Sequence, residues 1–433
     1  MRSIHNDVHN DVHSDVGLCP HCFIVPPHIL EQMATSGDPH LAEMAGRTMR
    51  LSQSVVAFRA QLSTGAPSPA AVRRTGLRRQ VFDCNGTTDL PGDPVRSESD
   101  KKAVRDKAVN EAFDHSGTTW KFYNQIFGRE SVDDHGKTLV SSVHFDRQYD
   151  NAFWNGQQMV YGDGDGVIFQ GFTGALDVIA HELTHGVTQF TAQLAYQDQP
   201  GALNESISDV FGSIVKQWAL GETVDEADWL IGADILAPGV HGRALRDMEH
   251  PGTAYDDPNL GKDPQPGHMK DYVKTESDNG GVHINSGIPN RAFVLAAKAI
   301  GGHSWETAGK IWYAALTQRL TGMSGFAEAA RETVSVARDL FPQDPSIAAK
   351  VASAWVEVGV LEETSVTMEI ANVAAAYVIA PRMREVAVAF PTAKKAKRKP
   401  VRRAVAAKKI APAKSKKAAP AKKKPTTSWS RKK

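Results

Sequence analysis

Two histidines spaced four positions apart, in the segment HELTH at residues 181–185, constrain this chain more than any other feature. On a helix, residues four positions apart lie on one face, so both imidazoles can reach a single ion. Glu182 directly follows the first of them and would then point to the same cleft. The alternative is a helix that carries two exposed histidines. The spacing therefore predicts a helix with a metal site that has two histidine ligands.

A third ligand follows in the segment NESISD, residues 204–209. HExxH is a signature of zinc-dependent peptidases, and a catalytic zinc ion takes three protein ligands and keeps a fourth position open for water. Glu205 and Asp209 are four residues apart, so one can bind the metal while the other accepts the N–H of a ligating histidine. Alone, such a pair could be a solvated helix face. Because it follows HELTH after one short connection, it favours a zinc site.

The segment DNGGVHINSG, residues 278–287, contains a further histidine and a carboxylate. Peptide hydrolysis places negative charge on the carbonyl oxygen, and a hydrogen-bond donor directed at that oxygen stabilises it. A histidine whose other nitrogen is held by a carboxylate suits this role. Asp278 and His283 could form such a pair, with the two glycines allowing a tight backbone. A structural histidine in a turn is the alternative.

Together, these motifs resemble those of the thermolysin-like zinc metallopeptidases, and particularly the protealysin-type branch with a short pro-segment. The resemblance covers about residues 78–360. It includes NAFWNG at residues 151–156, which is similar to the substrate-binding edge strand of the family, and QMVYGDGDG after it. It implies an α+β fold of two domains, a β-rich N-terminal domain and a mainly α-helical C-terminal domain, with the zinc cleft between them.

The resemblance also implies a set of catalytic roles. One zinc ion would be bound by His181, His185 and Glu205. Glu182 would take a proton from the attacking water and deliver it to the leaving amine, which agrees with the way zinc lowers the pKa of water. His283 and Tyr196 would stabilise the oxyanion. Asp278 would orient His283, and Asp209 would orient a zinc-binding histidine.

Further residues would bind the substrate, again by resemblance. Asn151 and Ala152 would bind its backbone, and Arg246 would hold one of its carbonyl groups. An apolar pocket for the side chain after the scissile bond would be lined by Phe169, Phe172, Val178 and Leu245. Such a pocket favours Leu- or Phe-like side chains, with a discrimination of about 1–3 kcal/mol per methylene.

Larger members of the family hold a pair of calcium ions with carboxylates near the second helix. This chain keeps Asp177 and Asp228, but other matching positions hold Lys216, Leu230 and Ala233. A lysine in the place of a ligand for a hard cation opposes calcium electrostatically. We therefore expect no double-calcium site.

The chain divides into four segments. They are 1–77, a pro-segment and linker; 78–190, a β-rich N-terminal peptidase domain that ends in the HELTH helix; 191–361, an α-helical C-terminal peptidase domain; and 362–433, an Ala/Lys/Pro-rich basic tail that we expect to be largely disordered. In the second segment, β-like runs such as RQVFDC and KTLVSSVHF surround one early helix that begins near Lys102. In the third, apolar residues recur at three- and four-residue spacing, which predicts helices.

The first segment resembles the pro-segment of the same branch, in which a Pro-Pro motif followed by an apolar residue enters the active-site cleft. Here Pro26 and Pro27 are followed by His28. Proline suits a plug because its fixed φ lowers the entropy cost of an extended segment and because it presents no N–H. We expect the enzyme to be latent until the linker is cut near residues 73–79, a cut that it could make itself.

Cys19 and Cys22 form a C-x-x-C pair before this plug, and several interpretations stay open. The pair could bind a zinc ion of its own, form a redox dithiol, or have no special role; in a bolder version one thiolate caps the catalytic zinc in the latent form. The HNDV repeat before it could bind metal weakly, although a disordered polar leader is the simpler interpretation. With Cys84 the chain has three cysteines, too few for a disulfide framework.

The net charge of +1 conceals a strong asymmetry. Residues 391–433 contain 18 Lys and Arg and no Asp or Glu, which leaves 32 basic and 49 acidic residues in the rest of the chain. Such a tail suits non-specific binding to a polyanion, either DNA or a cell-envelope polymer, through counterion release. An alternative function is therefore a nucleic-acid- or surface-binding protein whose peptidase part is an inactive scaffold.

The location of the protein is less constrained by the sequence. No run of about 18 apolar residues predicts a membrane span, and the N-terminus lacks the apolar core of a standard signal peptide. The resemblance favours a secreted monomer that acts on proteins or peptides. A cytoplasmic enzyme is the alternative.

Overall fold

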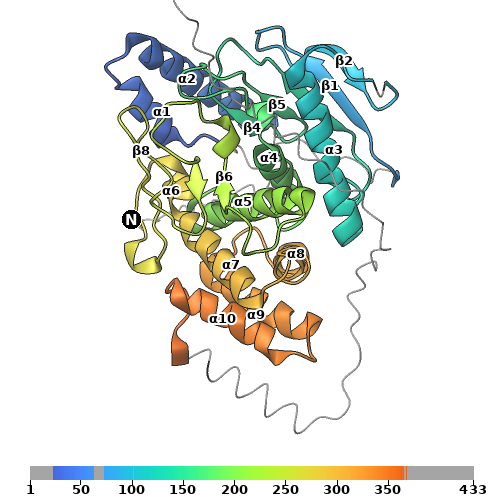
Figure 1. Cartoon of the computed structure of the whole chain (residues 1–433), viewed down its shortest axis with the longest axis vertical. Coiled ribbons are helices and arrows are strands. Elements are labelled where there is room, and N and C mark those ends of the chain that lie inside the picture. The colour runs from blue at the N-terminus through green and yellow to red at the C-terminus, as the bar shows by residue number, and fades with distance from the viewer. Residues whose placement is uncertain (1–22, 63–72, 101, 365–366, 368–433) are drawn as a thin grey trace, which may run out of the picture. The chain divides into compact units, whose positions relative to one another are not determined.

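Figure 1 shows a computed structural model of the chain, in which residues 23–62, 73–100, 102–364 and 367 are described. The HNDV repeat, the C-x-x-C pair and the basic tail lie outside these residues, so the interpretations placed on them stay predictions. The described chain has its main β-sheet in the first half and mostly α-helices in the second. The predicted α+β fold is thus confirmed.

Among the described residues, a five-stranded sheet forms the N-terminal half. Its strands are β1 (Arg79–Asp83), β2 (Asp93–Ser97), β3 (Leu139–Val143), β4 (Ala152–Trp154) and β5 (Met159–Tyr161). Their order is β2-β1-β3-β5-β4, with β1, β3 and β5 parallel and the two outer strands antiparallel to their neighbours. Strand β4 therefore lies at one edge, where an extended segment can pair with its free backbone groups.

Helix α3 (Lys107–Phe127) packs against β1 and β3. It begins later than the sequence pattern predicts, because Asp106 caps it by accepting a hydrogen bond from the N–H of Val109 at 3.0 Å. It ends at Gly128, whose φ of 71° is the left-handed conformation that commonly terminates helices.

Helices α4 (Leu176–Gln189) and α5 (Asp198–Leu220) lie side by side and carry the HELTH and NESISD segments. They approach closely because Gly212 of α5 faces α4. A Cβ at this glycine would meet the carbonyl oxygen of Asp177 at 2.7 Å and the Cβ of His181 at 3.4 Å. The absence of that atom lets the metal-binding candidates of the two helices come within reach of each other.

Further helices and short elements complete the C-terminal half. The helices are α6 (Asp278–Asn285), α7 (Gly287–Ile300), α8 (Ala308–Gln318), α9 (Phe326–Leu340) and α10 (Pro345–Glu357). The short elements are η1 (Phe172–Gly174), β6 (Leu230–Ile231), η2 (Ala233–Ile235), β7 (Arg246–Asp247), β8 (Asp256–Asp257), β9 (Gly261–Lys262) and η3 (Met269–Asp271). Buried aromatic rings join the helices, as where Trp312 of α8 stacks on Trp355 of α10 with centroids 6.2 Å apart.

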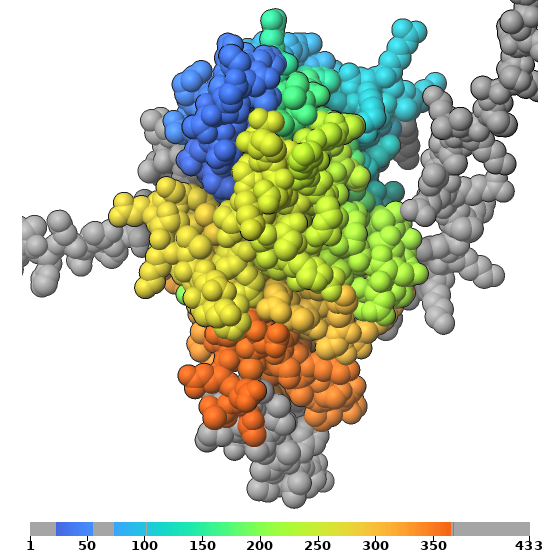
Figure 2. Space-filling model, turned by 60° about the vertical axis from the view of Figure 1, so that its left-hand side comes forward, coloured from blue at the N-terminus to red at the C-terminus, as the bar shows by residue number. Residues whose placement is uncertain are grey.

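The N-terminal segment forms helices α1 (Pro27–Ala34) and α2 (Pro39–Leu62), which are blue in Figure 1. Helix α2 packs on the chain just before β4, where Thr48 Oγ1 accepts the N–H of Asp150 at 3.2 Å and Ser52 Oγ lies 2.8 Å from the hydroxyl of Tyr149. Figure 2 shows the blue surface of this segment directly beside the yellow-green surface of the middle of the chain. The pro-segment thus covers the edge strand β4.

Candidate active site

The HELTH residues of α4 and the NESISD residues of α5 meet in one buried cluster. His181 Nε2 and His185 Nε2 are 3.0 Å apart, and the carboxylate oxygens of Glu205 lie 3.5 and 3.4 Å from them. All three side chains are at most 1% exposed. Their ligand atoms lie within 4.8 Å of one another, so one ion could contact them all.

Side chains of α5 orient the two histidines. His181 Nδ1 lies 2.8 Å from Asp209, and His185 Nδ1 lies 2.9 Å from Asn204 Oδ1 and 3.1 Å from Ser208 Oγ. When each Nδ1–H is donated to these acceptors, each Nε2 presents its lone pair to the cluster. Burial lowers the pKa of His185 to about 3, so this ring is neutral and able to bind a metal.

The cluster has the chemistry of a zinc site. When both rings carry their proton on Nδ1, the two Nε2 lone pairs are 3.0 Å apart and repel unless a cation lies close to both. Glu205 Oε2 is buried without a hydrogen-bond partner, which is costly for a carboxylate that binds no cation. Two imidazoles and one carboxylate are among the ligand sets of catalytic zinc ions. The residues present therefore fit zinc.

Glu182 and Tyr196 lie next to the three ligands. Glu182 is fully buried, and its Oε2 accepts a hydrogen bond from the N–H of Trp154 in β4 at 2.9 Å. Tyr196, on the loop between α4 and α5, donates its hydroxyl to Glu205 and lies 3.3 Å from His283 Nε2. The structure thus brings the predicted general base and both predicted oxyanion donors to the cluster.

Asp278 and His283 form the pair that the sequence suggests. Asp278 accepts hydrogen bonds from His283 Nδ1 at 2.6 Å and from the His283 backbone N–H at 2.9 Å. The turn between them requires left-handed backbone at Gly280, where φ is 84° and a Cβ would collide with Asp198. Burial opposes protonation of His283, but Asp278 and Glu205 raise its pKa to about 9. A cation bound to Glu205 would weaken the second of these effects.

An extended stretch of the pro-segment, Phe23–Val25, lies beside the cluster and pairs antiparallel with β4. The N–H of Ile24 donates to the carbonyl oxygen of Ala152 at 3.1 Å. The Asn151 side chain holds Val25 on both sides: its Oδ1 accepts the Val25 N–H at 2.9 Å and its Nδ2 donates to the Val25 carbonyl at 3.2 Å. Asn151 and Ala152, which the sequence predicts to bind a substrate backbone, thus bind the backbone of the pro-segment.

Two carbonyl groups of this stretch contact basic side chains. The carbonyl oxygen of Phe23 lies 2.9 Å from His283 Nε2, and that of Ile24 accepts a hydrogen bond from Arg246 Nη1 at 3.0 Å. Arg246 also donates to Asp209 through Nε and Nη2, both at 2.8 Å. Although burial opposes ionisation of Asp209, the Arg246 guanidinium holds the pKa of that carboxyl well below its usual range. Arg246 therefore connects the bound backbone to a residue that orients a metal ligand.

The four predicted pocket residues and Ile24 all belong to the main hydrophobic core of the described chain. Phe169, Phe172, Val178 and Leu245 are each at most 2% exposed, and the two phenylalanine rings have centroids 5.7 Å apart. Ile24 is itself fully buried. The side chain that follows the Phe23 carbonyl thus enters an apolar environment.

The pro-segment backbone groups that form hydrogen bonds with the site precede the two prolines. The sequence predicts Pro26 and Pro27 as the plug, whereas the backbone groups bonded to the site belong to the stretch Phe23–Val25 before them. Pro26 is extended, with φ −64° and ψ 149°, and Pro27 is the first residue of α1. Proline is favoured there because its fixed φ suits the first turn, where its missing N–H has no partner. The prolines therefore end the inserted strand and begin a helix.

Three residues that support the site are absent from the sequence prediction. Asn204 and Ser208 hold one of the histidines, and Asn290 Nδ2 donates to Asp209 at 2.8 Å. Asn204 and Ser208 are four apart and flank Glu205, so the helical spacing that identifies Asp209 could have identified them as well. Asn290 is 81 residues from its partner, and no local pattern indicates that contact.

Lys216 lies between Asp177 and Asp228, the two carboxylates that the resemblance matches to calcium ligands of larger family members. Its Nζ is 2.8 Å from Asp228 and 3.6 Å from the buried Asp177. Leu230 and Ala233, in β6 and η2, supply no carboxylate. An ammonium group thus provides the positive charge beside the two retained carboxylates.

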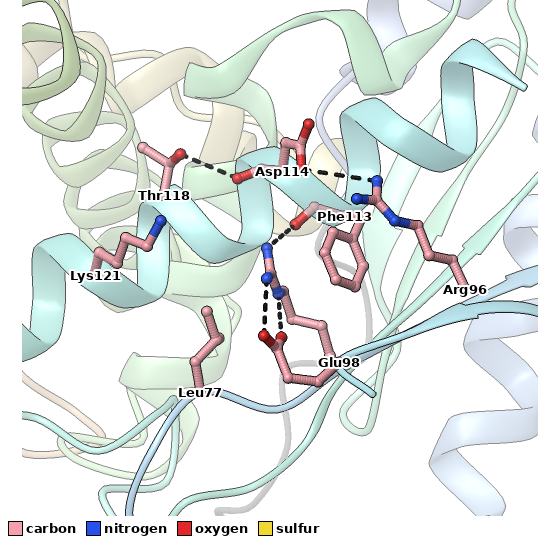
Figure 3. Close-up of a pocket in the computed structure, with 8 residues that line it drawn as sticks. Leu77, Arg96, Glu98, Phe113, Asp114, Thr118 and Lys121 are labelled. Atoms are coloured by element: carbon pink, nitrogen blue, oxygen red, sulfur yellow. Dashed lines mark hydrogen bonds and ion pairs between the residues drawn. The ribbon is translucent and has the colours of Figure 1, made fainter. Parts of the chain in front are cut away.

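A separate surface pocket of about 430 Å3 is lined by residues of β1, β2 and α3 and includes none of the cluster (Figure 3). Its arginines are engaged within the fold: Arg79 forms hydrogen bonds to Glu98 at 2.7 and 3.2 Å, and the guanidinium groups of Arg79 and Arg96 lie 3.6 and 3.8 Å from the centre of the Phe113 ring. These contacts attach the sheet to α3, and we assign the pocket no catalytic role.

Known proteins resemble this chain over most of its length. The family model described as thermolysin metallopeptidase, catalytic domain, matches residues 69–189, and that described as its alpha-helical domain matches residues 192–360. An extracellular metalloprotease of Pectobacterium carotovorum subsp. carotovorum is 50% identical over 79% of this chain and 97% of that protein. Protease PrtS of Photorhabdus sp. (strain Az29) is 44% identical over 78% of this chain and 91% of that protein. The solved structure of the precursor of protealysin, a metalloproteinase from Serratia proteamaculans, is 48% identical, has a TM-score of 0.71 and covers 78% of this chain and 99% of that one.

The fold, the ligand cluster and these relatives define a zinc-dependent endopeptidase with a pro-segment. The chain belongs to the thermolysin metallopeptidase family. The predicted family, fold class and enzyme class are confirmed, and its substrates are proteins or peptides. The alternative of an inactive scaffold that binds polyanions finds no support in these comparisons.

The relatives also bear on location. Those from Pectobacterium carotovorum and Serratia marcescens are extracellular metalloproteases by name. In the part of the chain that the structure describes, no helix is long and apolar enough to cross a membrane.

Proposed function

We propose that His181, His185 and Glu205 bind one zinc ion and that this centre hydrolyses peptide bonds that precede an apolar residue. The observation that carries the proposal is the way the stretch Phe23–Val25 binds beside the cluster. Its backbone forms hydrogen bonds with the protein on both sides of the peptide bond between Phe23 and Ile24. The side chain after that bond, Ile24, is fully buried among apolar residues.

Glu182 is proposed as the general base. A bound zinc ion would lower the pKa of water and polarise the substrate carbonyl. Glu182 would accept the proton that the water loses and deliver it to the leaving amine. The hydrogen bond from the Trp154 N–H supports this role, because it fixes one oxygen of the carboxylate and thereby the direction of the other. Glu182 is fully buried while the pro-segment is docked.

His283 and Tyr196 are proposed to donate hydrogen bonds to the oxyanion. Support comes from the 2.9 Å contact of His283 Nε2 with the carbonyl oxygen of Phe23 and from the position of the Tyr196 hydroxyl beside it. Asp278 would keep His283 protonated, since it accepts the Nδ1–H. A donor of this kind contributes about 10²–10³-fold to kcat.

Substrate recognition is proposed to follow the contacts of the pro-segment. Asn151 and Ala152 would bind the substrate backbone, and Arg246 would hold the carbonyl group after the scissile bond. The apolar pocket would be formed by Phe169, Phe172, Val178 and Leu245. Branched or aromatic side chains such as Leu, Ile and Phe would be preferred there, by about 1–3 kcal/mol per methylene.

The pro-segment is proposed to keep the enzyme latent until the linker is cut near residues 73–79. Phe23–Val25 uses the backbone acceptors and donors that a substrate needs, and α2 covers the chain before β4. Arg79 already belongs to β1 and is paired with Glu98, which favours a cut on its N-terminal side. After such a cut, the segment up to the linker could leave as a unit.

Further proposals concern ions, location and partners. We propose that the double-calcium site is absent, supported by the ion pairs of Lys216 with Asp177 and Asp228. We propose that the protein is secreted, supported by the extracellular relatives, and that it acts as a monomer. The basic segment 391–433 is proposed to bind DNA or an anionic cell-envelope polymer, supported by its 18 basic residues.

The proposal is tested on full-length protein that trace trypsin has cut in the arginine-rich linker. It should hydrolyse casein and a peptide with Leu after the scissile bond. A zinc chelator or the substitution Glu182→Ala should abolish both activities. Glu306→Ala, at an exposed glutamate, is the matched control and should keep them. Full activity of the Glu182→Ala protein would refute the proposed general base.

A further inference from the structure

We propose that the peptide bond between Phe23 and Ile24 is cut by the enzyme's own active site, so that the leader before Ile24 is removed while the rest of the pro-segment stays docked. The inference rests on the proposed function and identifies a processing site distinct from the linker. It follows from the register in which the pro-segment meets the catalytic residues.

Both sides of this bond are held as the scissile bond of a substrate would be. On the acyl side, the carbonyl oxygen of Phe23 lies 2.9 Å from His283 Nε2, the proposed oxyanion donor. On the amine side, the Ile24 N–H donates to the carbonyl oxygen of Ala152 at 3.1 Å, and the next carbonyl accepts from Arg246 at 3.0 Å. A segment bound in this register presents a bond to the nucleophile instead of merely obstructing the cleft.

The side chains on either side of the bond also suit cleavage. Ile24 is an apolar residue that is fully buried in the hydrophobic core, to which the proposed pocket residues also belong, so it satisfies the expected preference after the scissile bond. Phe23 is 8% exposed, and its ring packs on Phe153 of β4 with centroids 5.2 Å apart. Phe153 in turn contacts Phe145 and Tyr149 at 5.6 and 6.2 Å between ring centroids. These contacts fix the residue before the bond as well.

The reaction is a simple hydrolysis. The oxygen of a water molecule bonds to the carbonyl carbon of Phe23, and the bond from that carbon to the nitrogen of Ile24 breaks. Glu182 takes a proton from the water and passes it to that nitrogen. The products are a leader that ends in a carboxylate at Phe23 and a chain that begins with an amine at Ile24. No oxidant, reductant or co-substrate other than water is needed.

Cleavage here would not free the cleft. The chain from Ile24 onward keeps its bonds to Arg246 and to the Asn151 side chain. It also keeps the docking of both pro-segment helices, through the 2.9 Å contact of His28 with Tyr255 and the α2 contacts before β4. The remaining pro-segment is therefore a product held in place, and latency persists until the linker is cut.

The test is the intact mass and N-terminal sequence of purified, zinc-loaded full-length protein during incubation near pH 7. A chain that begins at Ile24 should accumulate with a first-order rate that does not change when the protein is diluted tenfold. A chelator and the substitution Glu182→Gln should prevent its formation. Size-exclusion chromatography should show the leader separated, and peptide hydrolysis should stay suppressed.

Two pro-segment variants sharpen the test. Ile24→Asp places a charge in the apolar cluster and should slow the cut by at least about tenfold. Gln32→Ala, in α1 and away from the bond, should be cut at the unchanged rate. If trypsin-treated protein hydrolyses the peptide but no chain ever begins at Ile24, this inference fails alone. If neither the peptide nor the chain is cut, the proposed function fails and the inference fails with it.

Discussion

The metal cluster and the pro-segment contact lie next to each other but are built differently. The cluster comes from two adjoining helices, and its ligands span only residues 181–205. The pro-segment contact joins Phe23–Val25 to side chains 126, 222 and 260 residues further along the chain. The metal cluster is therefore part of the folded core. Inhibition by the pro-segment depends instead on long-range backbone contacts, and a single cut in the linker allows the pro-segment to dissociate.

Removal of the metal should have the largest effect, because it acts on the cluster directly. A chelator should abolish peptide hydrolysis, and one equivalent of zinc should restore it. Asn204→Ala removes an acceptor of His185 Nδ1 and should weaken zinc binding about 10–100-fold, measured by competition with a chromogenic chelator. Gln318→Ala, at an exposed position of α8, is the control. Unchanged zinc affinity in Asn204→Ala would contradict the prediction.

Loss of the oxyanion donor should come next. His283→Asn should lower kcat by about 10²–10³-fold with a smaller change in KM, because the donor acts on charge that develops in the transition state. Asp278→Asn should act in the same direction through the orientation of His283. Steady-state kinetics on the trypsin-cut enzyme measure both. An effect confined to KM would mean that His283 only binds substrate.

Acid should weaken the pro-segment contact by a smaller and graded amount. Burial lowers the pKa of docked His28 from 6.5 to about 4; His283 and Arg246 act in the same direction and Asp278 in the opposite one. The docked state thus binds fewer protons than the free segment, so docking should weaken as pH falls from about 6.5 to 4, by up to about tenfold per pH unit, and no further below 4. His28 Nδ1 is buried without a partner that could stabilise its protonated form.

This acid dependence is measured on linker-cut Glu182→Gln protein, in which the pro-segment is held without a covalent bond. The fraction of free pro-segment after size-exclusion chromatography gives the docking equilibrium at each pH. In His28→Leu the part of the pH dependence that comes from this ring should vanish. Identical pH profiles of the two proteins would exclude His28 as its source.

Calcium should have the smallest effect. Because Lys216 already pairs with both retained carboxylates, millimolar calcium should leave the Tm of the enzyme unchanged. Thermal unfolding with and without calcium measures this. A large, stoichiometric rise in Tm would show that the ion pairs of Lys216 do not replace a calcium site.

The parts of the site that the sequence predicts are those encoded by local spacing. The pair His181 and His185 follows from helical periodicity, which also offers Glu205 and Asp209 as candidates for a third ligand; the family resemblance is what favours Glu205. Asp278 and His283 are five residues apart in one turn. The β-like and helical runs are visible in the same way, whereas the two-domain fold class comes from the family resemblance. Physical chemistry that acts over a few residues is visible in a single sequence.

The parts that the sequence does not predict depend on long-range contacts. Phe23, Ile24 and Val25 have the composition of any buried strand, and nothing local indicates that β4 will be their partner. The Pro-Pro motif is conspicuous, so the prediction centres on it, although proline lacks the N–H that pairing needs. Helix α3 begins after the start that its sequence pattern predicts, because the cap at Asp106 competes with the helical pattern before it.

Asp209 links the metal cluster energetically to the pro-segment contact. One carboxylate accepts hydrogen bonds from His181 and from Arg246, and Arg246 also holds the carbonyl oxygen of Ile24. A zinc ion bound through His181 and a peptide in the cleft would therefore be coupled through the charge of Asp209. By reciprocity, the factor by which the peptide changes zinc affinity is the factor by which zinc changes peptide affinity. Because of that coupling, the affinity of the pro-segment for the cleft should differ between the metal-free and the metal-bound protein.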